Sequence, residues 1–290
     1  MIDQDTEIQP IQRMIALDGR GAGEMAYLDF GNQDRPVDLV FLHANGFNAL
    51  TYRHVLAPLA KRFRILAVDQ RGHGLTSLDI DLVGRRDWLD LRDDLLAFVA
   101  AHNLHGVVLS GHSMGATAAL LAASEQPDCC RRLALFDPVI LPTSMERVSA
   151  ESPMIVGAKR RRAVFPSRAA AIASYTGRGA FKTWPEAILA DYVTAGFRET
   201  PDGEVTLTCA PAWEASGFAA HGHDPWDALR QSACPIEILR AETGSTFHIE
   251  GAEAVDPGRI RVSVAPGSTH FIPMEFPDLI RSRLAAAIEA

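Results

Sequence analysis

Gly111-His112-Ser113-Met114-Gly115 is the stretch that decides the fold of this chain. The apolar run Val107–Leu109 precedes it and predicts a buried strand, while the alanine-rich segment Ser113–Glu125 predicts a helix. A serine at such a strand-to-helix turn is held exposed, and the glycines beside it relieve crowding where the chain folds back. The start of the helix adds free backbone N–H groups. We therefore predict that Ser113 is a nucleophile.

A second motif, Leu42-His43-Ala44-Asn45-Gly46-Phe47, ends a buried strand predicted over Val37–Leu42. Small residues at positions 44 and 46 permit a tight turn whose N–H groups can face an anion. Acyl transfer needs two such donors for the oxyanion. We predict the backbone N–H groups of Asn45 and Met114. By itself, the motif is also compatible with a plain turn between a strand and a helix.

The general base is expected to be a histidine late in the chain. His270 stands in Gly267-Ser268-Thr269-His270-Phe271, between the strand predicted over Ile260–Val264 and the closing helix predicted over Phe276–Ala290. Loops at the carboxyl ends of parallel strands meet at one edge of a sheet, so this loop can reach Ser113. His248 is the rival, but it follows the previous strand at a longer distance.

Strand-like and helix-like segments alternate through the first half of the chain, as in α/β proteins. The pattern breaks between residues 141 and 230, where the sequence is helical in character. Strand-like segments then resume at Ile236–Leu239. We predict a core domain over 1–140 and 231–290, with a helical cap inserted over 141–230. The remaining predicted elements are strands at Ile11–Leu17, Met25–Phe30, Ile65–Val68 and Leu133–Phe136, and helices at Ala49–Ala60 and Trp88–Ala101.

These motifs, together with Asp69-Gln70-Arg71-Gly72-His73-Gly74-Leu75-Thr76-Ser77, resemble the α/β-hydrolase family. The resemblance runs from about residue 11 to the end of the chain and is weakest over 141–230. It implies an α/β fold with a mostly parallel eight-stranded sheet flanked by helices. It also implies that the insertion covers the active site, and that the segment Asp69–Ser77 is mainly structural.

The triad acid departs from the common family pattern. Family members usually carry an aspartate after the strand that corresponds to Ile236–Leu239, and here that position holds Gly244. Asp137 is the preferred candidate, because it ends the strand Leu133–Phe136 and Pro138 fixes the turn after it. Some members, notably haloalkane dehalogenases and some lactonases, take their acid from this strand. Glu242 is the alternative acid, and a purely structural Asp137 is the other possibility.

A serine at this turn favours attack on an acyl carbonyl, with no metal or organic cofactor. We expect a moderately apolar carboxylic ester or lactone as the small-molecule substrate. Three alternatives stay open: a cofactor-free perhydrolase or acyltransferase, a C–C bond hydrolase, and a non-catalytic binding protein. Aromatic residues of the insertion either line the substrate pocket or form the cap's own core; they are Tyr175, Trp184, Tyr192, Phe197, Trp213 and Trp226.

Composition limits the possible partners. The 290 residues are 47% hydrophobic and 22% charged, with a net charge of -8, so a nucleic-acid partner is not expected. No apolar stretch is long enough for a membrane helix, and the N-terminal residues do not resemble a secretory signal. The cysteines at 129, 130, 209 and 234 show no metal-binding spacing. We expect a cytoplasmic monomer or homodimer with reduced thiols.

Overall fold

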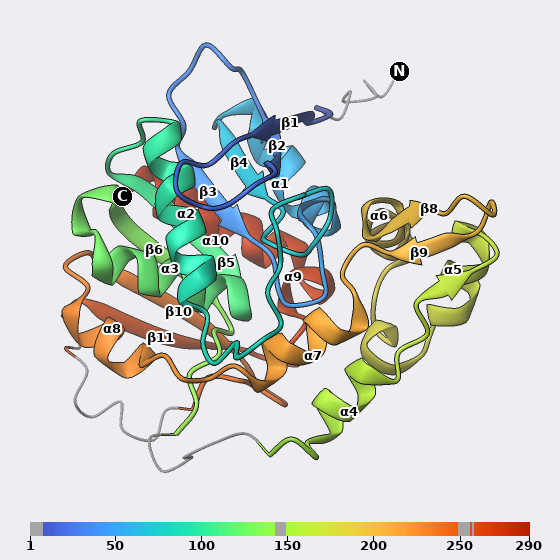
Figure 1. Ribbon diagram of the computed structural model, residues 1–290. Helices are drawn as coiled ribbons and strands as arrows, with labels where there is room; N and C mark the ends of the chain where they lie inside the picture. Colours follow the sequence, from blue (N-terminus) through green and yellow to red (C-terminus); the bar gives the residue numbers. More distant parts are fainter. Residues whose placement is uncertain (1–7, 143–148, 249–255, 257) are drawn as a thin grey trace.

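A computed structural model of the chain describes residues 8–142, 149–248, 256 and 258–290 (Figure 1). An eight-stranded sheet runs through it in the order β1-β2-β4-β3-β5-β6-β10-β11. Pairing is antiparallel between β1, β2 and β4 and parallel from β4 through to β11. The strands of this sheet are β1 (Ile11–Ile15), β2 (Met25–Phe30), β3 (Leu39–Leu42), β4 (Ile65–Val68), β5 (Val107–His112), β6 (Cys130–Phe136), β10 (Ile236–Ala241) and β11 (Ile260–Ala265).

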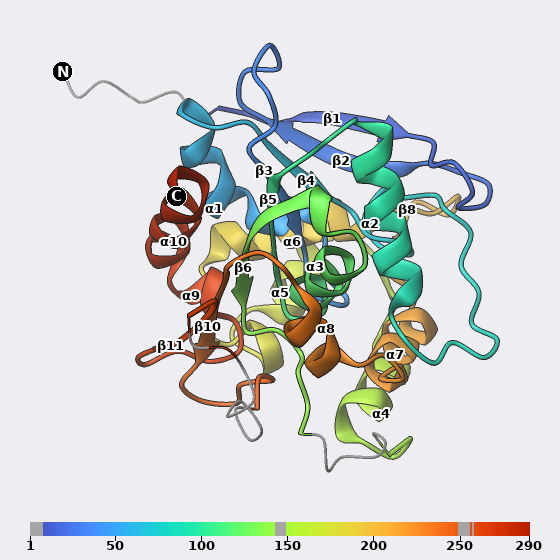
Figure 2. The ribbon, with the colours of Figure 1, turned by 90° about the vertical axis from the view of Figure 1, so that its left-hand side faces the viewer.

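Helices cover both faces of the sheet (Figures 1 and 2). One hydrophobic cluster joins α2, α3 and α8 to one face, and a second joins α1 and α10 to the other. The central strands are therefore buried on both sides, which explains their continuous apolar sequences. This confirms the predicted α/β-hydrolase fold. The helices of these layers are α1 (Arg53–Leu56), α2 (Leu89–Ala101), α3 (Met114–Glu125), α8 (Pro225–Gln231), α9 (Ile272–Glu275) and α10 (Pro277–Glu289).

The chain order of the sheet reverses between β3 and β5. These two strands are neighbours, although β4 lies between them in sequence and pairs with the other edge of β3. The connections that follow β3 and β5 therefore leave the sheet in opposite directions. Such a switch point opens a crevice at the carboxyl ends of the strands. The loops of Asn45 and Ser113 both begin there.

The segment predicted as a helix over Ala49–Ala60 is a mixture of short helical turns. A 3₁₀ turn at Ala49–Tyr52 leads into α1, and a second 3₁₀ turn spans Ala57–Lys61. Pro58 stands inside the second turn and has no N–H to donate, which interrupts a regular α-helix here. Two further 3₁₀ turns are found at Pro127–Cys129 and Gly179–Phe181.

The insertion over 141–230 contains strands as well as the expected helices. Three short strands, β7, β8 and β9, pair antiparallel in a small sheet of their own. Helix α8 falls within the same range but packs against α3 in the core layer. The division into core and cap stays a prediction. The elements beside the core are α4 (Pro153–Lys159), β7 (Val164–Phe165), α5 (Arg168–Tyr175), α6 (Glu186–Gly196), β8 (Phe197–Glu199), β9 (Val205–Leu207) and α7 (Pro211–Ala219).

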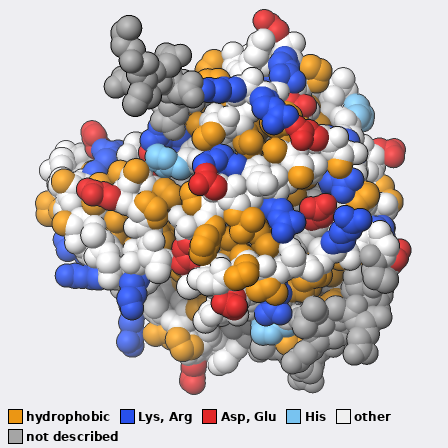
Figure 3. All heavy atoms as spheres, turned by 180° about the vertical axis from the view of Figure 1, so that it is seen from behind, with side chains coloured by type: hydrophobic (Ala, Val, Ile, Leu, Met, Phe, Trp, Pro, Cys, Tyr) orange, Lys and Arg blue, Asp and Glu red, His pale blue; other side chains and the backbone are white. Residues whose placement is uncertain are grey.

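The surface seen from behind carries charges of both signs. Figure 3 shows Lys and Arg side chains interspersed with Asp and Glu side chains around a group of hydrophobic side chains. Among the described residues, no helix has the length and apolar character needed to cross a membrane. The predicted partners, oligomeric state and cytoplasmic location stay predictions.

Candidate active site

Ser113 lies on a strained turn between β5 and α3. Its backbone has φ 55° and ψ −122°, a conformation that costs a non-glycine residue about 1–3 kcal/mol. The glycines of the motif allow the turn to pack closely. A Cβ atom on Gly115 would lie 2.5 Å from the carbonyl oxygens of Leu42 and His43. The sequence thus allows α3 to approach β3 closely and hold the Ser113 hydroxyl at the carboxyl edge of the sheet.

The structure brings His270 to Ser113. His270 follows β11, and its Nε2 lies 3.0 Å from the Ser113 Oγ. A hydrogen bond of this length is what a general base needs to accept the hydroxyl proton. The rival His248 instead donates its backbone N–H to the Ile140 carbonyl at 3.0 Å.

Asp137 contacts the other nitrogen of His270. The distance between Asp137 Oδ2 and His270 Nδ1 is 2.6 Å, and the aspartate is wholly buried. Asp137 has φ 43°, so the chain turns sharply at the end of β6 and presents the carboxylate to the neighbouring loop. Asp137, His270 and Ser113 therefore form one continuous hydrogen-bonded chain.

The last residue of β10 and the loop after it anchor the Asp137 carboxylate. Oδ1 accepts from the Ala241 N–H at 2.8 Å and the Ser245 hydroxyl at 2.5 Å, and Oδ2 accepts from the Thr246 N–H at 3.0 Å. Burial by itself would raise the pKa of Asp137. The hydrogen bond and charge of His270, helped by these donors, outweigh burial and hold that pKa below its ordinary value. The carboxylate is thus kept ionised beside the imidazole.

Glu242 does not reach His270. Its side chain is exposed and accepts the Gly267 N–H at 2.9 Å. Ser245 and Thr246, which sequence reasoning did not single out, instead complete the environment of Asp137. The sequence did contain an indication of this role: two residues with hydroxyl groups directly follow Gly244, which stands where family members usually carry the triad aspartate. The catalytic assignments themselves stay a prediction.

Two residues that border the pocket beside Ser113 have backbone N–H groups for which no protein acceptor is found in the described part of the chain. Asn45 and Met114 both border the same pocket as Ser113. Within the residues that the structure describes, neither N–H donates to a protein acceptor. The Asn45 turn is held from the insertion, because Asn45 Nδ2 donates to the Glu214 carbonyl at 2.9 Å and the Tyr192 hydroxyl to the Gly46 carbonyl at 3.3 Å. Both predicted oxyanion donors are therefore available for a ligand.

A pocket of about 300 Å³ opens above these groups, between the core and the insertion. Its described lining residues include no Lys or Arg, and the carboxylate of Glu214 is held by Arg161 at 3.0 Å. The six aromatic residues proposed from the insertion do not border it in the described part of the chain; several pack in the core clusters instead. The aromatic side chains that do border it are Phe47, Trp88, Phe218 and Phe271.

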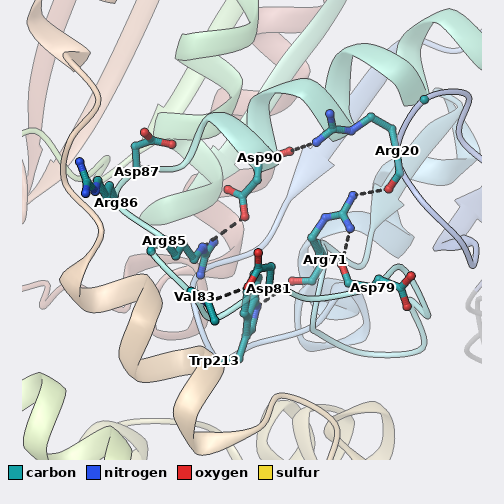
Figure 4. Close-up of a pocket in the computed structure, with 12 residues that line it drawn as sticks. Arg20, Arg71, Asp79, Asp81, Val83, Arg85, Arg86, Asp87, Asp90 and Trp213 are labelled. Atoms are coloured by element: carbon teal, nitrogen blue, oxygen red, sulfur yellow. Dashed lines mark hydrogen bonds and ion pairs between the residues drawn. The ribbon is translucent and has the colours of Figure 1, made fainter.

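A second hollow of about 450 Å³ lies on the surface beside α7 (Figure 4). Charged side chains line it, but they bind one another. Arg85 Nε lies 3.2 Å from the Asp90 carboxylate, and its guanidinium stacks 3.8 Å from the Trp213 ring. None of the three candidate catalytic residues borders this hollow. Among the residues described, no three His, Cys, Asp or Glu side chains gather as a metal site requires.

Two bacterial proteins are similar to this chain in sequence. The chain is 25% identical to 2-(acetamidomethylene)succinate hydrolase of Mesorhizobium japonicum over 264 residues, which cover 87% of this chain and 88% of that protein. It is 31% identical to N-formylmaleamate deformylase of Pseudomonas putida over 138 residues, 48% of this chain and 50% of that protein.

Solved structures and a family model agree with the fold. The crystal structure of E-2-(acetamidomethylene)succinate hydrolase matches with a TM-score of 0.79 and 24% identity, covering 97% of this chain and 100% of that chain. The model of the alpha/beta hydrolase family matches residues 39–283, which include every candidate catalytic residue. This chain therefore belongs to the alpha/beta hydrolase family.

Proposed function

We propose that this hydrolase cleaves a moderately apolar carboxylic ester or lactone through an acyl-enzyme on Ser113. The observation that carries the proposal is the hydrogen-bonded chain from Asp137 through His270 to the Ser113 hydroxyl. This arrangement activates a serine, because the base accepts the hydroxyl proton while the carboxylate stabilises the resulting imidazolium.

The reaction follows from the positions of these groups. Ser113 Oγ attacks the carbonyl carbon as His270 Nε2 takes its proton. The carbonyl oxygen becomes an oxyanion that the Asn45 and Met114 N–H groups bind. His270 then gives the proton to the departing alcohol. A water molecule, deprotonated by His270 in the same way, attacks the acyl carbon, and His270 returns that proton to Ser113 Oγ as the bond to the serine breaks and the acid leaves.

The pocket supports a substrate without negative charge. Its described lining is mostly apolar and includes no Lys or Arg side chain to pair with a substrate carboxylate, and the Glu214 carboxylate at its wall is already paired with Arg161. A buried anion without a cationic partner is costly. The names of the relatives, by contrast, describe substrates that carry carboxylate groups. We therefore propose that this chain differs from them in substrate charge.

Amide cleavage is the second candidate, because the names of both relatives describe nitrogen-linked acyl groups. The same groups would carry it, with His270 protonating a departing nitrogen instead of an oxygen. Matched ester and anilide substrates with the same acyl group separate the two candidates.

The decisive experiment is a substrate panel with Ser113→Ala as the control. It contains neutral p-nitrophenyl esters, lactones, anilides and the anionic p-nitrophenyl hemisuccinate, and a fluorophosphonate probe reports serine reactivity independently. We expect probe labelling at Ser113 and turnover of neutral esters at least about tenfold faster than the hemisuccinate, a difference of about 1.4 kcal/mol. Absence of labelling in the folded protein would exclude the serine mechanism. Preference for the hemisuccinate would exclude the proposed substrate class.

Turnover products separate the remaining alternatives. Ester transfer to an added alcohol or to peroxide, in place of hydrolysis, would identify an acyltransferase or perhydrolase. A C–C bond hydrolase would bleach a ring-cleavage dienone and leave simple esters intact.

A further inference from the structure

A buried tyrosine and a buried histidine connect the two loops that flank Ser113. Tyr52 lies in the 3₁₀ turn after β3, and His112 is the last residue of β5. Both side chains are shielded from solvent, with exposures of 1% and 0%. The Tyr52 hydroxyl lies 3.1 Å from the Ala44 N–H and 2.8 Å from His112 Nδ1. His112 Nε2 lies 2.7 Å from the main-chain carbonyl oxygen of His270.

The direction of each hydrogen bond in this chain is fixed by what each group can do. The His270 carbonyl can only accept, so His112 Nε2 must carry a proton and donate it. In a neutral imidazole the other nitrogen, Nδ1, is then an acceptor and must receive the Tyr52 O–H. The Tyr52 oxygen has a lone pair left, which accepts the Ala44 N–H. The protons therefore all point from the turn that contains Asn45 toward the loop that contains His270.

His112 stays in this neutral form at ordinary pH. Burial, and secondarily the charge of His270, lower the pKa of His112 to about 3. The two imidazole rings lie 4.9 Å apart, so a charge on His112 would oppose the charge that His270 acquires during catalysis. A neutral neighbour avoids this repulsion and still supplies a hydrogen bond.

We propose that Tyr52 and His112 are positioning residues, which fix the loop of the base to the loop of the oxyanion donors on either side of Ser113. The inference rests on the proposed function. Neither residue borders the substrate pocket, so they act through the groups they hold rather than on the substrate. One chain of hydrogen bonds thereby fixes the positions of the loop that carries the proposed base and of the turn that carries one proposed oxyanion donor. Displacement of such groups by ~1 Å can lower the rate of catalysis by about 10²-fold.

Three variants test the chain. Tyr52→Phe removes only the hydroxyl, and His112→Leu removes both nitrogens with a side chain that fits an apolar site. His112→Gln keeps one donor and one acceptor in its amide. Tyr27→Phe is the matched control, because Tyr27 is a buried tyrosine in β2, away from the pocket. Each protein is compared with wild type for kcat and KM on p-nitrophenyl butyrate, for the rate of fluorophosphonate labelling, and for thermal stability.

We expect Tyr52→Phe and His112→Leu to lower kcat and the labelling rate by about tenfold to 100-fold, with KM little changed. The double variant is expected to lose no more than the worse single variant, because the chain acts as a unit. His112→Gln is expected to recover most of kcat, and Tyr27→Phe to keep it.

Two outcomes overturn the inference. One is that folded Tyr52→Phe and folded His112→Leu keep the wild-type kcat. The other is that His112→Gln is as slow as His112→Leu at equal thermal stability, which would leave only a packing role. A wild-type protein that neither takes the probe nor hydrolyses the ester would instead refute the proposed function, so the two failures can be told apart.

Discussion

Replacing Asp137 with asparagine tests the proposed triad at the member that departs from the common family pattern. The carboxylate accepts hydrogen bonds on both oxygens, and asparagine must place an NH₂ group at one of them. Beside His270 Nδ1, this group would force the proton of the imidazole onto Nε2, where it blocks the transfer from Ser113. At the other oxygen position, it would face the Ala241 N–H, which lies 2.8 Å from Oδ1 and would lose its acceptor. The first orientation gives the imidazole the wrong tautomer, and the second leaves a buried backbone donor without an acceptor; both lose the negative charge beside His270.

The expected loss is large because charge and tautomer are both affected. Asp137 is completely buried and lies 2.6 Å from the Nδ1 of His270. Water therefore cannot take the place of the lost carboxylate beside the imidazole. A triad with the wrong tautomer loses about 10⁴-fold in kcat, which corresponds to about 5 kcal/mol in the activation free energy. KM should change little, since Asp137 does not border the pocket.

The assay is steady-state turnover of the best ester from the panel, and Glu242→Gln is the matched control. Glu242 is exposed, and among the described residues its carboxylate accepts only the Gly267 N–H, a bond that the amide oxygen of glutamine can keep, so this variant should keep kcat near the wild-type value. The folded state of Asp137→Asn is checked by circular dichroism and thermal unfolding. If folded Asp137→Asn retained more than about a tenth of wild-type kcat, or if Glu242→Gln showed the larger loss, the assignment of the acid would be wrong.

Three further outcomes follow from the structure. Ser245→Ala removes a hydroxyl donor from the Asp137 carboxylate and should lower kcat by about tenfold in the same assay, corresponding to about 1.4 kcal/mol. Gly115→Ala should destabilise the fold by more than about 2 kcal/mol in denaturant unfolding because its Cβ would meet backbone, whereas Gly157→Ala, in open space on a helix, should stabilise it by about 0.5–1 kcal/mol. Burial lowers the pKa of His43 to about 4 and of His112 to about 3, from 6.5, so below pH ~6.5 the unfolded chain binds protons that the folded protein does not bind. The free energy of unfolding should therefore fall by ~1.4 kcal/mol per pH unit for each histidine as the pH drops from ~6.5 to ~4. Denaturant unfolding at a series of pH values checks this, and a stability that does not change with pH would contradict it.

The positions of Ser113 and His270 were predictable because they depend on local patterns. Each follows a strand that the sequence reveals, Ser113 after the buried β5 and His270 after the partly exposed edge strand β11, and parallel strands bring the loops after their carboxyl ends to one edge. The fold was predictable because the alternation of strands and helices is also a local pattern of apolar residues. Asp137 was predictable only as one of two candidates, since two strands end in reach of the base.

Other features depend on contacts that no local pattern encodes. Ser245 hydrogen-bonds a carboxylate 108 residues earlier in the chain, and only the pairing of β6 with β10 brings them together. The insertion's aromatic residues were equally suited to a pocket or a core by composition. Their positions are set by packing against the sheet, where Trp184 and Tyr192 join the same cluster as α10. The short strands β7 to β9 lacked a clear alternating pattern because they have two or three residues each.

The hydrogen-bonded chain that joins Asp137, His270 and Ser113 has a consequence for folding kinetics. His270 is 133 residues from Asp137 and 157 from Ser113, and the groups that donate to the Asp137 carboxylate lie at the end of β10 and in the loop after it. Contacts between such distant segments form late, because closing long loops is entropically unfavourable before the sheet is complete. During refolding, helical circular dichroism should therefore return before hydrolytic activity or probe labelling. The reactive serine would then be assembled only in molecules whose β6, β10 and β11 have already paired.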